Sequence, residues 1–233
     1  YAEIKALATG NPYIKEKMDL DIQVSKLQLL KQSFLNQKYE MEDQVAKHLP
    51  ARIREQETWI MQYEADIAQV KAHTSPDRET FPVMQIGDHS YTEKKEAGQA
   101  IIDACKAMKS PEPVPLGAYR GLSMELSYSS ASKEFVIALH GKGTYKVPLG
   151  TDIHGNITRL DNKINELPDN LSRCREVLET VKSQLETAKV EAQKEFPQEK
   201  ELAEKVARLG ELNALLDMDK KDHIVMEEEP EEE

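Results

Sequence analysis

Apolar residues between Leu160 and Ala192 repeat at alternating steps of four and three along the chain. The positions are Leu160, Ile164, Leu167, Leu171, Cys174, Leu178, Val181, Leu185, Ala188 and Ala192. Such spacing places a narrow apolar seam along a helix. It predicts that the seam is buried by a second, nearly parallel helix and not by a sheet. Pro168 interrupts this run. Because the register continues beyond it, we expect only a kink.

An earlier segment, residues 12–73, carries the same spacing, and its length nearly equals that of the segment 157–216. Asn11 suits a helix N-cap and Pro12 a first helical position, while Pro50 and Pro197 predict local breaks. Two arms of matching length separated by an inserted region predict an antiparallel hairpin. The alternative is that each arm pairs with another copy of the chain in a dimer.

Between the arms, residues 74–156 change to period-two alternation with many turn-forming residues. The expected elements are strands over 81–86 and 89–91 around a Gly87-Asp88 turn, a helix capped by Thr92 and ending near Met108, a stiff Pro111–Pro115 linker, and strands over 122–128, 135–140 and 145–147. The predicted order is therefore β-β-α-β-β-β, a small α+β domain.

The predicted fold class is thus mainly α with an α+β insert. It is a long antiparallel coiled-coil hairpin that carries the small domain at its tip. The segments are residues 1–11 as the end of a preceding segment, 12–73 as the first arm, 74–156 as the tip domain, 157–216 as the returning arm, and 217–233 as an acidic disordered tail.

Composition agrees with an elongated helical body. Charged residues make up 31% of the chain and aromatic residues 6%, which leaves little bulky material for a thick core. The net charge of -11 comes in large part from the acidic C-terminal end.

Cys105 and Cys174 lie far apart in sequence, and we expect both to be buried, reduced thiols of a cytoplasmic protein. We expect neither a membrane span nor a signal peptide.

Reactive residues show no catalytic spacing. The histidines form no H-E-x-x-H motif, and the sequence contains neither a Cys-x-x-Cys pair nor a Walker-type glycine loop. Asp152, His154 and Asn156 resemble the start of a calcium loop, but Ile157 stands where glycine is needed and Lys163 where the closing glutamate belongs. We therefore expect no catalytic residue, no metal site and no cofactor in this chain.

The candidates for contact with a nucleic acid or a protein partner are polar residues of the middle region. They are Lys94, Lys95, Tyr119, Arg120, Lys133, Lys142 and Lys146. Cations beside aromatic rings on a small sheet can hold single-stranded nucleic acid by stacking and phosphate contact. Against this, Tyr91, Tyr119, Tyr128 and Tyr145 largely fall in period with core positions, and the region has nearly balanced charges. Both interpretations remain open at this point.

Several short motifs resemble, in the same order, a family of very large proteins of mobile elements and phages. The motifs are Ala2–Pro12, Glu16–Asp21, Tyr91–Gly98, Gly117–Gly121, Gly155–Asp161, Phe196-Pro197 and Arg208–Leu216. In that bacterial family a DNA methylase is fused to a Snf-type superfamily II helicase. The resemblance implies an accessory region C-terminal to the helicase, with the methylase and ATPase motifs, and their ATP and S-adenosylmethionine, upstream of this chain.

Two functional hypotheses follow. The first is a non-catalytic interaction arm, monomeric or weakly dimeric, that presents the small domain to DNA or to a protein partner beside the helicase and methylase domains. The second is a free-standing coiled-coil scaffold that associates with itself and has no nucleic-acid role. Because the sequence begins at Tyr1 without an initiator methionine, we expect it to be a fragment of a longer polypeptide.

Overall fold

The computed structural model describes residues 12–74 and 80–227, and side chains in the last helix as far as Asp217. The chain divides into two compact units. One comprises residues 1–48 and 185–233, and the other comprises residues 49–184. The molecule is mainly helical and contains one six-stranded antiparallel sheet, which agrees with the predicted combination of long helices and an α+β insert.

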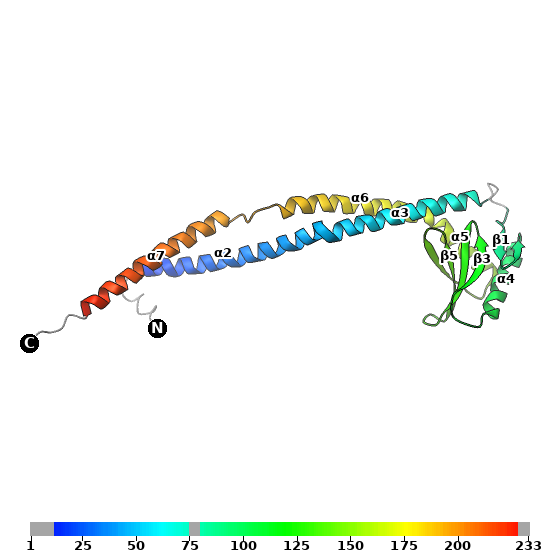
Figure 1. Cartoon of the computed structure of the whole chain (residues 1–233), viewed down its shortest axis with the longest axis horizontal. Coiled ribbons are helices and arrows are strands. Elements are labelled where there is room, and N and C mark those ends of the chain that lie inside the picture. The colour runs from blue at the N-terminus through cyan, green and yellow to red at the C-terminus, as the bar shows by residue number, and fades with distance from the viewer. Residues whose placement is uncertain (1–11, 75–79, 228–233) are drawn as a thin grey trace, which may run out of the picture. The chain divides into compact units, whose positions relative to one another are not determined.

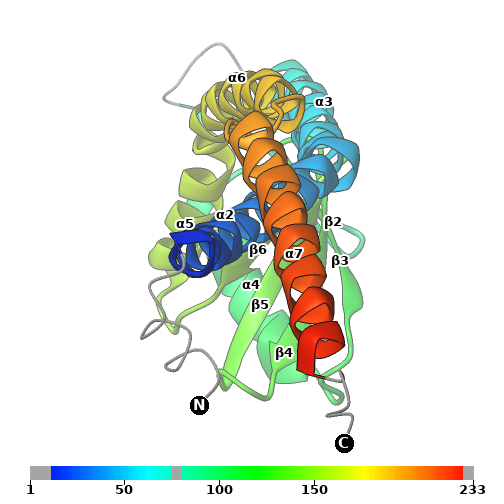
Figure 2. The ribbon, with the colours of Figure 1, turned by 90° about the vertical axis from the view of Figure 1, so that its left-hand side faces the viewer.

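The first unit is built on two long helices, α2 (Pro12–Asp43) and α7 (Glu199–Glu227). They lie side by side (Figure 1 and Figure 2), and Val24 and Leu27 of α2 form a small apolar core with Leu202 of α7. Arg208 of α7 donates two hydrogen bonds to Glu16, at 2.8 and 3.1 Å. Hydrogen bonding to Arg208 lowers the pKa of the Glu16 carboxyl.

Pairing between α2 and α7 is antiparallel. Glu16 contacts Arg208, whereas Lys31, farther along α2, contacts Glu199, which is earlier in the chain, at 2.6 Å. The same direction continues before α7, where the rings of Phe34 and Phe196 lie 5.7 Å apart. The helical periodicity therefore predicted the apolar pair correctly in this unit.

The break expected at Pro50 takes the form of a π-helical turn, η1 (Gln44–His48), directly before α3 (Leu49–Ala72). Proline cannot donate to the carbonyl four residues earlier, and its ring crowds that carbonyl. A widened turn before the proline accommodates both effects. The cap expected at Asn11 lies outside the described residues.

The second unit contains the sheet. Its strands are β1 (Met84–Ile86), β2 (His89–Tyr91), β3 (Val114–Tyr119), β4 (Leu122–Ser129), β5 (Glu134–His140) and β6 (Thr144–Pro148), and its helices besides α3 are α4 (Lys94–Ala107), α5 (Ile153–Asn165) and most of α6 (Leu167–Ala192). The strands are ordered β2-β1-β3-β4-β5-β6, all antiparallel. Helices α4 and α5 share one apolar core with the strands of the sheet.

The strand order predicted from sequence was wrong in one element. Val114–Tyr119, which includes the end of the expected stiff linker, is strand β3, so the order is β-β-α-β-β-β-β. Pro115 is tolerated there because β1 pairs only with residues 117–119, so the missing proline N–H has no ladder partner on that side. A register shift between Pro115 and Gly117 marks the irregular start of the strand.

The seam at the start of the returning segment is not buried by a partner helix alone. Leu160, Ile164 and Leu167 belong to the same core as Met124 and Leu139 of the sheet. The expectation that no sheet buries this seam was therefore wrong for these residues. The α+β core also extends beyond the predicted tip domain of residues 74–156, because α3 and α5 contribute to it.

Three further expectations concern where helices begin, kink and end, and two of them need correction. Helix α4 begins at Lys94 with Glu93 as its N-cap residue, so Thr92 does not cap it. The interruption expected at Pro168 is confined to Glu166, between the end of α5 at Asn165 and the start of α6 at Leu167, and the backbone of Glu166 stays α-helical, as a kink requires. The disordered tail does not start at residue 217, since α7 continues its helical hydrogen bonding to Glu227; residues 228–233 lie outside the described part.

The two cysteines are free thiols, as expected from their sequence separation. Cys105 of α4 is buried, but Cys174 of α6 is partly exposed, so the expectation of burial holds for one of them. Burial raises the pKa of both thiols. None of the described helices is long and apolar enough to cross a membrane.

Candidate functional site

The turn between β3 and β4 consists of Arg120 and Gly121, whose φ angles are 49° and 82°. Two successive residues with positive φ are typical of a tight hairpin turn. The turn places Arg120 between Thr74, which follows the end of α3, and Asp161 and Asn165 of α5. Sequence spacing did not indicate this convergence.

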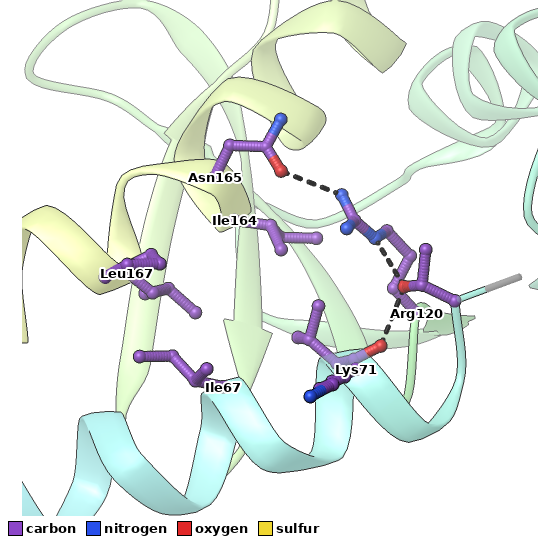
Figure 3. Close-up of a pocket in the computed structure, with 9 residues that line it drawn as sticks. Ile67, Lys71, Arg120, Ile164, Asn165 and Leu167 are labelled. Carbon is purple, nitrogen blue, oxygen red and sulfur yellow. Dashed lines mark hydrogen bonds between the residues drawn. The ribbon is translucent and has the colours of Figure 1, made fainter. Parts of the chain in front are cut away.

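Arg120 is held from two sides (Figure 3). Its Nε donates to Thr74 Oγ1 at 3.0 Å, and its Nη1 donates to Asn165 Oδ1 at 3.2 Å. Nη1 also lies 3.5 Å from Asp161 Oδ1, a longer ionic contact, and the arginine side chain is 13% exposed. The guanidinium is therefore fixed in position largely by neutral acceptors.

Asp161 also accepts a hydrogen bond of 2.7 Å from the Tyr119 hydroxyl. Tyr119 is fully buried. Burial, followed by the negative charge of Asp161 and the bond to it, raises the pKa of this tyrosine above its ordinary value. Tyr119 is consequently a neutral donor inside the core, and the expectation that it contacts a partner from the surface was wrong.

A pocket of about 420 Å³ opens beside Arg120. Aliphatic side chains form most of its wall, and polar groups stand at its rim: the lining residues are Ile67, Val70, Lys71, Thr74, Arg120, Ile164, Asn165, Leu167 and Pro168. In Figure 3, Ile67, Ile164 and Leu167 face one another across the pocket while Arg120 closes one side. This volume lies within the range of small-molecule sites.

The other predicted contact residues do not gather at this pocket. Lys94 donates to Thr158 of α5 at 3.3 Å, and Lys95 is exposed on α4. Lys133 and Lys142 flank opposite ends of the seven-residue strand β5, which separates them by roughly 20 Å at strand rise. Lys146 is exposed on β6 and pairs in register with Ala138. The lysines thus occupy several separate places.

A second polar cluster is centred on Asp66 of α3, which is fully buried. Its carboxylate accepts hydrogen bonds from the backbone N–H of Lys142 at 2.5 Å, the N–H of Gly143 at 2.8 Å and the Tyr145 hydroxyl at 2.6 Å. These bonds attach α3 to the β5–β6 turn. A sequence signal existed, because Asp66 lies on the apolar face between Tyr63 and Val70.

The calcium-loop residues have structural roles. Asp152 caps α5 by accepting a bond from the Gly155 N–H, and the buried Asn156 bonds to both the N–H and the carbonyl of Gly150. Within the described part of the chain, no group of three or more histidine, cysteine, aspartate or glutamate side chains is placed to hold a metal ion.

Comparison with known proteins adds no family. No protein-family model, no curated protein and no solved structure matches this chain.

Proposed function

We propose that this chain is a non-catalytic interaction arm, a helical hairpin that presents its sheet domain to a protein partner. The observation that carries the proposal is contact between helices that precede the sheet in sequence and helices that follow it. Helices α2 and α7 form an antiparallel pair in the first unit, and α3 contacts α6 in the second. In the first unit Lys31 pairs with Glu199. In the second unit Glu64 of α3 pairs with Arg175 of α6 at 2.7 Å.

If the helix contacts of the two units belong to one continuous pair of arms, the arms form a hairpin. Helices α2, η1 and α3 succeed one another without an intervening loop from Pro12 to Ala72. At 1.5 Å per residue, such a segment would reach about 90 Å if straight. An arm of this length would hold the sheet domain away from the rest of the protein at its other end, and this geometry suits contact with a partner.

A protein partner is favoured over DNA by the distribution of cations and rings. DNA-binding sheets of the stacking type combine a continuous basic groove with exposed aromatic rings. Here Lys133 and Lys142 lie at opposite ends of β5, while Tyr119 and Tyr145 are buried and their hydroxyls bond to aspartates. The proposed setting, beside a helicase core, rests on the resemblance of the sequence motifs.

The continuity of the first arm, which the hairpin requires, is tested by distance measurement between spin labels. We would replace Cys105 and Cys174 with alanine and label cysteines introduced at Gln28 of α2 and Glu57 of α3, both exposed. A continuous arm predicts one narrow distance near 44 Å, roughly the helical rise over the intervening residues. A broad or much shorter distribution would contradict the hairpin.

The choice of partner is tested by titrating the chain with single- and double-stranded DNA at two salt concentrations. We expect no saturable binding even at low salt. Tight binding that weakens steeply with salt would instead assign the domain to DNA. Helicase motifs in the coding frame upstream of Tyr1, and binding of this chain to the encoded upstream segment, would support the proposed setting.

A second candidate function is a self-associating scaffold. Ile22 and Leu29, seven residues apart on one face of α2, are 68% and 69% exposed. Exposed aliphatic residues at this spacing can pair with another helix. Light scattering separates the two candidates: a monomer supports the arm, whereas an obligate dimer that I22S and L29S disrupt supports the scaffold.

A further inference from the structure

The pocket beside Arg120 is lined by both aliphatic and polar side chains, which a packing defect in an apolar core would not require. One side is aliphatic, with Ile67, Ile164 and Leu167 facing the space, and the rim carries Lys71, Arg120 and Asn165 (Figure 3). Apolar walls with a few convergent polar groups are the usual composition of ligand sites.

The charges at this pocket have one sign. Its nine lining residues include two cations and no carboxylate, although the chain has 42 acidic and 31 basic residues. Among the described residues, no carboxylate pairs with Lys71. Asp161 contacts Arg120 at 3.5 Å while it accepts the Tyr119 hydroxyl bond of 2.7 Å, and its single negative charge leaves an excess of positive charge over Arg120 and Lys71 together. The pocket therefore favours an anion.

The side chain of Arg120 is also held in position before any ligand binds. Its backbone is set by the β3–β4 turn, and Thr74 and Asn165 hold its guanidinium through Nε and Nη1. The structure gives Nη2 no acceptor among the described residues. A guanidinium whose position is already fixed loses little conformational freedom when it donates to an incoming carboxylate.

We propose that this pocket binds a small organic carboxylate. Its hydrocarbon part would lie against Ile67, Ile164 and Leu167, and its carboxylate would face Arg120 and Lys71. The inference concerns a binding site without a reaction, and it does not rest on the proposed interaction function. Small inorganic anions are not the expected ligands, because they would leave the aliphatic wall exposed to water.

The test uses hexanoate, phenylacetate and the neutral amide hexanamide as probes, each titrated into the full chain and followed by backbone amide NMR shifts. We expect saturable shifts at the lining residues with the carboxylates. Hexanamide should bind about tenfold more weakly, because it lacks the charge that Arg120 and Lys71 would stabilise. Equal affinity of acid and amide, or no saturable binding of either carboxylate, would overturn the proposal.

Variants locate the site. Lys71 is exposed, so K71Q is expected to fold, to weaken hexanoate binding roughly three- to tenfold and to leave hexanamide binding unchanged. N165F should fill the pocket and remove binding of both probes. K95Q, at an exposed lysine on α4, is the matched control and should alter neither. Equal effects of K71Q and K95Q would show nonspecific charge attraction and contradict the assignment.

Discussion

The buried carboxylate of Asp66 lies 2.6 Å from the Tyr145 hydroxyl, and it joins a helix to a strand hairpin more than seventy residues later in the chain. The rings of Tyr145 and Tyr63, one turn before Asp66 on α3, stack with centroids 5.9 Å apart. Polar bonds and ring packing thus act at the same junction, and removing either should loosen α3 from the sheet.

Replacing Asp66 with asparagine should destabilise the second unit by about 2 to 3 kcal/mol. The N–H₂ that replaces one carboxylate oxygen would face at least one backbone N–H donor, of Lys142 or of Gly143, in a buried site. Urea unfolding measures the loss. E57Q, at an exposed glutamate of the same helix, is the control and should stay within about 0.5 kcal/mol of the parent. Equal effects of the two variants would show that the Asp66 bonds contribute little.

Stability should fall at alkaline pH. The pKa values of Tyr119 and Tyr145 are raised in the folded state, mainly by burial and then by the neighbouring aspartates. The folded state therefore keeps protons that the unfolded chain releases above pH 10, so this contribution is complete below that pH and is lost as pH rises. The slope is up to about 1.4 kcal/mol per pH unit for each tyrosine.

Unfolding free energies measured between pH 8 and 11 check this dependence. Y119F and Y145F should each flatten the decline, since the group that releases the proton is gone. Y39F is the control, because the Tyr39 ring is 64% exposed, and its decline should match that of the parent. A decline that persists unchanged in Y119F and Y145F would contradict the assignment.

Two leucines of α2 should differ sharply in their effect on the first unit. Leu27 is buried against Leu202, whereas Leu29 is largely exposed. L27A should cost about 2 to 3 kcal/mol, because it removes buried methyl groups and leaves a cavity. L29A should change stability by less than about 0.5 kcal/mol. Hydrogen exchange of α2 and α7 amides measures both, and similar losses would argue against the antiparallel pair.

Alanine should have opposite effects at two glycines. Gly121 has a φ of 82°, and a Cβ there would lie 2.7 Å from the His73 ring, so G121A should destabilise by about 1 to 2 kcal/mol. Gly210 lies within α7 with nothing within 4 Å of its added Cβ, so G210A should stabilise by about 0.5 to 1 kcal/mol. Thermal unfolding decides the signs. A stabilising G121A would contradict the turn geometry.

The position of β3 shows where local sequence signals mislead. Three prolines between Pro111 and Pro115 indicate an extended linker, yet Val114 and Pro115 already pair with β4. Proline excludes a ladder bond only where a neighbouring strand needs its N–H, and β1 is too short to reach Pro115. Strand length in a neighbour cannot be inferred from the proline itself.

Leu160 and Ile164 make the same point for helices. Their spacing continues the seam that runs through α6, but the surface that buries them belongs partly to the sheet. Periodicity identifies the apolar side of a helix and carries no information about what covers it. The predicted contact residues show a related limit, because Lys133 and Lys142 are close in sequence but separated by a whole strand.

Local patterns by themselves determined the long helices, the alternating strands β4 to β6 and the turn at Gly87-Asp88, since each depends on residues within a few positions of one another. Tertiary structure decided the burial of Asp66 and Tyr119 and the assembly of the pocket from residues 67–74, Arg120 and residues 164–168. These features depend on contacts between segments far apart in the chain, and the repeat of apolar residues within a segment does not encode such contacts.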